Sequence, residues 1–74
     1  METNKFSPRM IADYEERRNA LLADGYRLRH ETTFNDGAMC RLHHMANGND
    51  IIILARGYTM TQKTNGVVTH TQRY

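Results

Sequence analysis

The chain has 74 residues, of which 39% are hydrophobic and 24% are charged. This size predicts one domain, close to the lower limit at which a single core stabilises a fold, so that a partner or a second copy would add stability. The composition excludes an intrinsically disordered chain, which would be less hydrophobic and more highly charged.

The net charge of +2 allows an acidic partner or nucleic acid without requiring either. The single cysteine, Cys40, cannot close an intrachain disulfide, which excludes a disulfide-stabilised secreted scaffold and favours a reducing setting. The longest apolar run, Ile51 to Ala55, is too short for a signal peptide or a membrane span. We therefore expect a cytoplasmic protein with no membrane partner.

An amphipathic helix is predicted between Ser7-Pro8 and Asp24-Gly25. The serine can accept hydrogen bonds from the free amides of a helix start, and proline suits the first helical position. Ile11, Tyr14 and Leu21 fall on one side of this helix, followed by Leu22. This apolar stripe is typical of a helix that covers a sheet.

After Gly25 the hydrophobic period changes to two residues, which indicates strands. Turn signals occur at Asn35-Asp36-Gly37, Asn47-Gly48 and Asn65-Gly66. They predict four strands, with a bend in the third at Arg56-Gly57; the spans are Tyr26 to Phe34, Ala38 to Ala46, Asn49 to Gln62 and Val67 to Arg73. The sequence thus predicts an α+β fold, one N-terminal helix packed on a four-stranded antiparallel β-meander (α-β-β-β-β), in a single domain of residues 1–74. The last strand either pairs within the chain or forms an edge for a second copy.

Turn lengths predict the pairing register. A three-residue loop with Gly37 in the left-handed conformation pairs Phe34 with Ala38 and His30 with Leu42. We prefer it to a two-residue Asp36-Gly37 loop, because the latter would set Glu31 opposite Leu42. A two-residue Asn47-Gly48 turn pairs His44 with Ile51 and Leu42 with Ile53, and the Asn65-Gly66 turn pairs Met60 with Thr71.

This register sorts the side chains onto two faces. The face under the helix is predicted to hold Tyr26, Leu28, His30, Phe34, Cys40, Leu42, His44, Ile51 and Ile53. The opposite face, which we call the outer face, is predicted to hold Arg27, Arg29, Glu31, Met39, Arg41, His43, Met45, Ile52, Leu54, Arg56 and Tyr58.

Candidates for chemistry centre on the segment CRLHHMANGND, residues 40–50. Adjacent His43 and His44 point to opposite faces of a strand and cannot share a ligand. Cys40, His44 and His30 would share the helix-facing side, where thiolate and imidazole suit zinc, but a two-pair zinc spacing is missing and a buried thiol flanked by histidines is the alternative. A nucleophilic Cys40 assisted by His44 would be screened by the helix.

Enzyme motifs are also missing from the sequence. It holds no phosphate-binding glycine loop, no G-x-S-x-G elbow and no H-E-x-x-H helix. The acidic residues Asp13, Glu15 and Glu16 are explained by ion pairs with neighbouring arginines on the helix. We therefore expect neither catalysis nor a bound cofactor or metal.

The outer face combines apolar residues with arginines, which is typical of a protein interface. We expect a small non-enzymatic binding module or inhibitor that binds a protein partner or a second copy, as a homodimer. The residues expected to carry this binding are Arg27, Arg29, Arg41, His43, Ile52, Leu54, Arg56 and Tyr58. In size and in lacking enzyme motifs, the chain resembles accessory proteins of phages and mobile elements, many of which bind a host protein.

Two alternatives remain for this face. Arginines on phosphates, with Tyr58 or His43 stacked on bases, would make it a nucleic-acid surface. A solvated sheet face without any partner would carry the same residue types.

Overall fold

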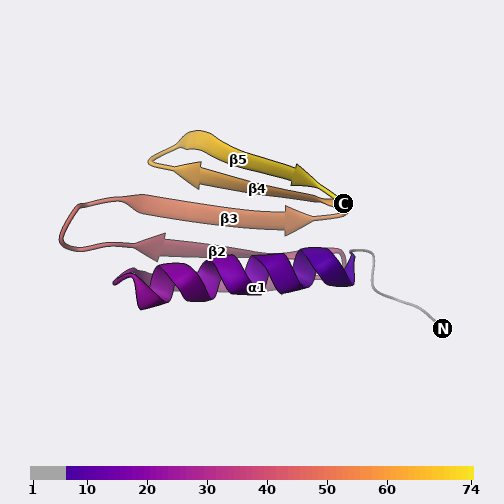
Figure 1. Ribbon diagram of the computed structural model, residues 1–74, viewed down its shortest axis with the longest axis horizontal. Coiled ribbons are helices and arrows are strands. Elements are labelled where there is room, and N and C mark those ends of the chain that lie inside the picture. Colours follow the sequence, from indigo (N-terminus) through magenta and orange to yellow (C-terminus); the bar gives the residue numbers. More distant parts are fainter. Residues whose placement is uncertain (1–6) are drawn as a thin grey trace.

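A computed structural model describes residues 7–74 of the chain. One helix, α1 (Pro8–Ala23), is followed by the strands β1 (Arg27–Phe34), β2 (Gly37–His43), β3 (Asp50–Arg56), β4 (Thr59–Thr64) and β5 (Val67–Arg73). The strands form one antiparallel sheet in the order β1-β2-β3-β4-β5, and α1 lies across one side of it (Figure 1). The predicted α+β class is confirmed, whereas the predicted number of strands is wrong, because the sheet has five. Within residues 7–74, no helix combines the length and the hydrophobicity needed to cross a bilayer.

The fifth strand arises at Gly57, where the predicted long strand turns back instead of bending. Gly57 has a φ of 62°, and Arg56 pairs with Thr59 across the turn. A glycine with positive φ at the first turn position is what a tight type II′ hairpin requires. The segment from Asn49 to Gln62 is therefore a hairpin of two strands.

Helix α1 begins and ends where the sequence predicts. The Ser7 side chain accepts a hydrogen bond from the Arg9 amide at 3.1 Å, and Gly25, with a φ of 104°, follows the last turn. Met10 and Tyr14 are the buried side chains of α1, which packs over β2, β3 and β4. They join a core that consists of Met10, Tyr14, Tyr26, Ala38, Cys40, Leu42, Ile51, Ile53, Ala55 and Met60.

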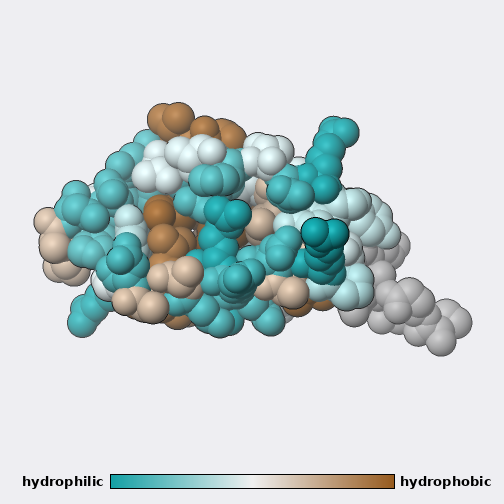
Figure 2. Space-filling view, viewed as in Figure 1, coloured by the Kyte–Doolittle hydropathy of each residue, from teal (hydrophilic) through white to brown (hydrophobic). Residues whose placement is uncertain are grey.

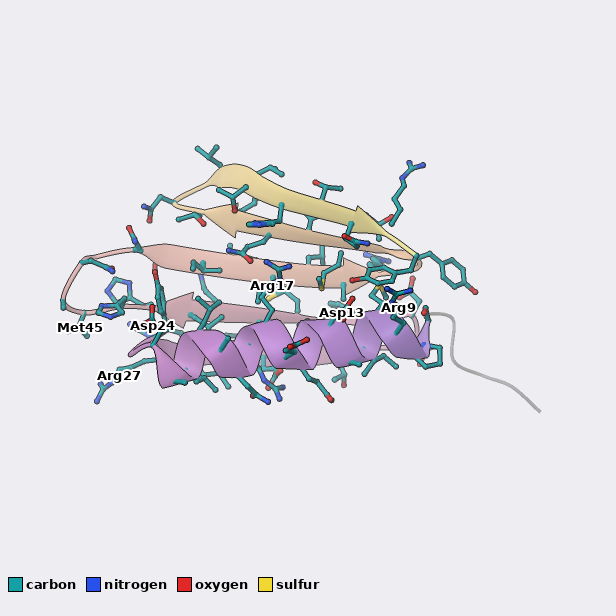
Figure 3. All side chains as sticks on the ribbon, in the orientation of Figure 1. Arg9, Asp13, Arg17, Asp24, Arg27 and Met45 are labelled. Carbon is teal, nitrogen blue, oxygen red and sulfur yellow. The ribbon has the colours of Figure 1, made fainter. Side chains whose placement is uncertain are left out.

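Polar contacts fix α1 along the β4 side of the sheet. Arg17 donates a hydrogen bond to the side-chain oxygen of Gln62 at 3.0 Å. The Tyr74 hydroxyl donates to Asp13 at 2.6 Å, and Asp13 and Arg17 lie on the upper side of the helix in Figure 3. These bonds link the helix to β4 and to Tyr74, which follows β5.

The register of β1 differs from the predicted one. Phe34 pairs with Gly37 across a two-residue turn, so that Glu31 pairs with Cys40. A bulge between Leu28 and His30 then changes the register again. The turn thus places Glu31 on the helix side and His30 and Phe34 on the outer face, the reverse of the prediction for all three, and the bulge returns Leu28 and Arg27 to their predicted faces. The physical reason is that α1 supplies hydrogen-bond partners for Glu31, described below.

The register between β2 and β3 is also shifted, but this shift moves no side chain to the other face. Leu42 pairs with Ile51 instead of Ile53, because a longer loop, closed by a hydrogen bond from the His44 amide to the Asn49 carbonyl at 3.0 Å, joins β2 to β3. A shift of two residues keeps every side chain on its face, so Ile51 and Ile53 are buried as predicted.

The last hairpin keeps its predicted turn. Asn65 and Gly66 have φ values of 53° and 84°, as a type I′ turn requires. A register shift between Gln62 and Lys63 sets Met60 opposite Gln72 instead of Thr71. The last strand, β5, pairs with β4 of the same chain and is exposed along its length, including Val67 and Val68. Figure 2 shows hydrophobic atoms exposed at the upper edge of the molecule.

Candidate binding face

The outer face is the side of the sheet that α1 leaves open, behind the strands as drawn in Figure 1. By strand register its charged and apolar members are Arg27, His30, Phe34, Met39, Arg41, His43, Asp50, Ile52, Leu54, Arg56, Lys63, Val68 and Arg73. Met45 and Tyr58 are not among them. Met45 lies in the loop between β2 and β3, and Tyr58 lies in the turn after β3, where 59% of its surface is exposed.

Charge is unevenly divided between the two sides of the sheet. The outer face carries Arg27, Arg41, Arg56, Lys63 and Arg73, and its acidic side chain is Asp50. The acidic residues Asp13, Glu15, Glu16, Asp24 and Glu31 lie on α1, at its end, or on the helix side of β1. Helix α1 also carries Arg9, Arg17 and Arg18, but they are fewer than the acidic residues on that side, so the open face is the cationic side of the described chain.

Apolar side chains occupy the centre of the outer face. Met39 pairs with Leu54 across β2 and β3, and Ile52 lies two residues before Leu54 on the same face. Met39 and Ile52 are half-buried, and Leu54 is 37% exposed. The sequence placed these residues correctly on the outer face.

Next to this centre, four basic or imidazole side chains line one open pocket of about 660 Å³: Arg29, His30, Arg41 and His43, together with Asp50. The bulge in β1 adds Arg29 to the strand between Leu28 and His30. Bulges often redirect side chains beside functional sites. We call this group the cationic pocket.

Hydrogen bonds within the cationic pocket involve its histidines. His43 Nδ1 lies 2.7 Å from Asp50 Oδ1, and His30 Nε2 lies 2.9 Å from the Thr32 hydroxyl. Among the described residues, Arg29 and Arg41 take part in no ion pair. Since like charges on neighbouring strands repel, an anion bound between these arginines would be favourable.

The residues predicted to bind a partner thus divide into three groups along the strands. Arg27, Arg29 and His43 lie at one end, Ile52 and Leu54 lie at the centre with Arg41 directly opposite Ile52, and Arg56 and Tyr58 lie at the opposite end. Arg56 pairs with Asp36 at 3.4 Å and lies 5.7 Å from the Phe34 ring centre, so its charge is partly neutralised. His30 was missed, because the two-residue turn that pairs Phe34 with Gly37 sets it opposite Arg41 on the outer face, whereas the sequence favoured a three-residue loop.

The possible metal ligands Cys40, His30 and His44 do not converge. Cys40 is fully buried on the helix side, His30 belongs to the outer face, and the His44 ring packs edge-on against Tyr26 with a centroid distance of 4.9 Å. Within residues 7–74 there is no group of three His, Cys, Asp or Glu side chains that could hold a metal ion. Burial also raises the pKa of the Cys40 thiol above its ordinary value, which disfavours a reactive thiolate.

Comparisons of the chain with protein-family models, with curated proteins and with solved structures found no match. The charge of the outer face and its apolar centre are therefore the observations from which a function can be inferred.

Proposed function

We propose that the protein is a non-enzymatic binding module whose outer face holds an acidic surface of another protein. The observation that carries this proposal is the division of charge: cations gather on the open side of the sheet, and the acidic residues of α1 lie on the other side. Complementary potentials steer partners together and reject partners of the same charge.

The apolar centre of the outer face favours a protein over other anionic partners. Met39, Ile52 and Leu54 provide side chains that a partner can desolvate, within a charged rim. The aromatic side chains near this face, Phe34 and Tyr58, lie at one end of it, away from the centre where stacked bases would need them. Homodimerisation through two outer faces would bring the arginines of both copies together, so an acidic partner is favoured over a second copy.

Nucleic acid is the second candidate, and the cationic pocket is the observation that favours it. Arg29 and Arg41, with His30 and His43 beside them, suit a phosphate group. Binding of this kind would weaken steeply with salt, because each neutralised phosphate releases counterions.

The two candidates are separated by titrating the protein with two fluorescent probes, a peptide of alternating Glu and Leu residues and a mixed-sequence single-stranded oligonucleotide, at low and raised salt. We expect the peptide to bind, and we expect Leu54→Asp and Arg41→Gln each to weaken peptide binding about tenfold. Arg9→Gln, which removes the same charge from exposed α1, is the matched control and should change little.

Two results would contradict the proposal. Tighter binding of the oligonucleotide, with a steep salt dependence that Arg41→Gln reduces, would make the outer face a nucleic-acid surface. A light-scattering mass of twice 8.6 kDa that Leu54→Asp returns to 8.6 kDa would make it a self-interface.

A further inference from the structure

A groove of about 420 Å³ opens on the helix side of the sheet, between α1 and β1. It forms because α1 packs over β2, β3 and β4 and leaves β1 beside it. The floor consists of small residues, Ala38 and Ala55, and the walls include Ile11 and Thr33. Its volume lies within the range of small-molecule sites, and its lining is mainly apolar.

A carboxylate lies at one end of this groove. Glu31 Oε2 accepts two hydrogen bonds, from the Tyr14 hydroxyl at 2.7 Å and from Arg18 Nη1 at 2.7 Å. Among the described residues, Glu31 Oε1 accepts no side-chain hydrogen bond, and the Glu31 side chain is 29% exposed. One carboxylate oxygen is thus left to a ligand.

The charge of the groove is negative. Arg18 is paired with Glu31, and Glu15 adds a second carboxylate to the lining. Burial alone would raise the pKa of Glu31, but the hydrogen bonds from Tyr14 and Arg18 hold it below its ordinary value, so that this carboxyl is ionised at neutral pH.

We propose that this groove binds a small organic amine, with its ammonium group at Glu31 Oε1 and its apolar chain against Ile11, Ala38 and Ala55. An ammonium ion supplies the donors that the free carboxylate oxygen lacks and compensates the charge of Glu15. The apolar chain gains free energy by leaving water for the alanine floor. This site lies on the opposite side of the sheet from the outer face and does not depend on the proposed function.

The test is an NMR titration of the isotope-labelled chain at pH 7 with hexylammonium, hexanol and hexanoate, which share one apolar chain and differ in the head group. We expect hexylammonium to shift the methyl signals of Ala38 and Ala55, with a dissociation constant on the order of 1 mM. Equal binding of hexanol or hexanoate, or no saturable shift with hexylammonium, would overturn the proposal.

Variants on α1 test the role of charge without disturbing the core. Glu15→Gln should weaken hexylammonium binding about threefold, as expected for a partly exposed ion pair. The matched control Glu16→Gln, on the same exposed turn but outside the groove lining, should not. Arg18→Gln frees Glu31 of its cation and should tighten binding, and weaker binding in this variant would contradict the assignment of Glu31.

A lysine-containing peptide provides the last comparison. If the peptide shifts the same methyl signals at a concentration at least tenfold lower than hexylammonium does, the groove takes a polypeptide side chain, and the proposal of a small amine fails. Similar or weaker binding of the peptide supports the small amine.

Discussion

The hydrogen bond between Tyr14 and Glu31 gives the most direct test of the sheet register. A double-mutant cycle of Tyr14→Phe and Glu31→Gln measures the coupling energy between these two side chains. The tyrosine is buried, and its hydroxyl donates to Glu31 Oε2 at 2.7 Å, a contact that exists only because Glu31 faces the helix side. In the register predicted from a three-residue loop, Glu31 would lie on the outer face and could not reach Tyr14.

The size of the effect follows from the environment of the bond. A hydrogen bond to a charged group contributes about 1.5–3 kcal/mol to stability. Because the Glu31 side chain is 29% exposed, water replaces part of the lost interaction, and we expect about 1.5 kcal/mol for Tyr14→Phe. A domain of this size has a free energy of unfolding of roughly 4–11 kcal/mol, so this loss is measurable.

Urea unfolding at pH 7 measures the cycle, and we expect a coupling energy of about 1 kcal/mol. The pKa of Glu31 in the folded state lies below its ordinary value, since the bonds from Tyr14 and Arg18 outweigh the effect of burial. Its ionised form therefore stabilises the fold above the pKa of the unfolded state, and this contribution is lost as the pH falls through the folded pKa. The coupling should shrink on acidification. A coupling below about 0.3 kcal/mol at pH 7 would refute the register.

Two further predictions concern a close backbone contact and the titration of a tyrosine. Gly37→Ala should be strongly destabilising in thermal unfolding, because a Cβ there would lie 1.8 Å from the Ala55 carbonyl oxygen. The control Gly48→Ala has no atom within 4 Å of the new Cβ but a φ of 74°, and it should cost about 1–2 kcal/mol. Similar losses of stability in the two variants would contradict this contact between β2 and β3. Burial and the hydrogen bond to Asp13 raise the pKa of Tyr74 to about 12, and ultraviolet titration should show a lower pKa in Asp13→Asn; an unchanged titration curve would exclude the contact.

Local signals in the sequence predicted much of the fold. The ends of α1 follow from Ser7-Pro8 and Gly25, and the Asn65-Gly66 turn has the geometry expected of its residues. Isoleucines 51 and 53 were placed in the core because strand alternation survives a register shift of two. Gly57 was recognised as a break in a strand, but a lone glycine does not distinguish a bend from a hairpin.

The register of β1 could not be predicted for a different reason. Matching apolar with apolar residues favoured the three-residue loop over a pairing that set Glu31 opposite Leu42. The cost of an inward carboxylate is offset by Tyr14 and Arg18, which belong to another element and whose contact with β1 exists only in the folded chain. The same error in the register of β1 assigned His30 to the wrong face and so left it out of the cationic pocket. Arg41, Ile52 and Leu54, on β2 and β3, were assigned to the correct face.

The bulge at Arg29 also bears on how this chain would align with relatives. By adding one residue, it gives the two halves of β1 opposite parity: odd positions point outward before it, as Arg27 does, and even positions point outward after it, as His30 does. A relative with a one-residue deletion here would need no change in β2 to keep its sheet. With Arg29 deleted, β1 would alternate regularly and each remaining residue would keep its face, whereas a relative that lacks the bulge but aligns without a gap should show the reversed hydrophobic pattern on one side of this point.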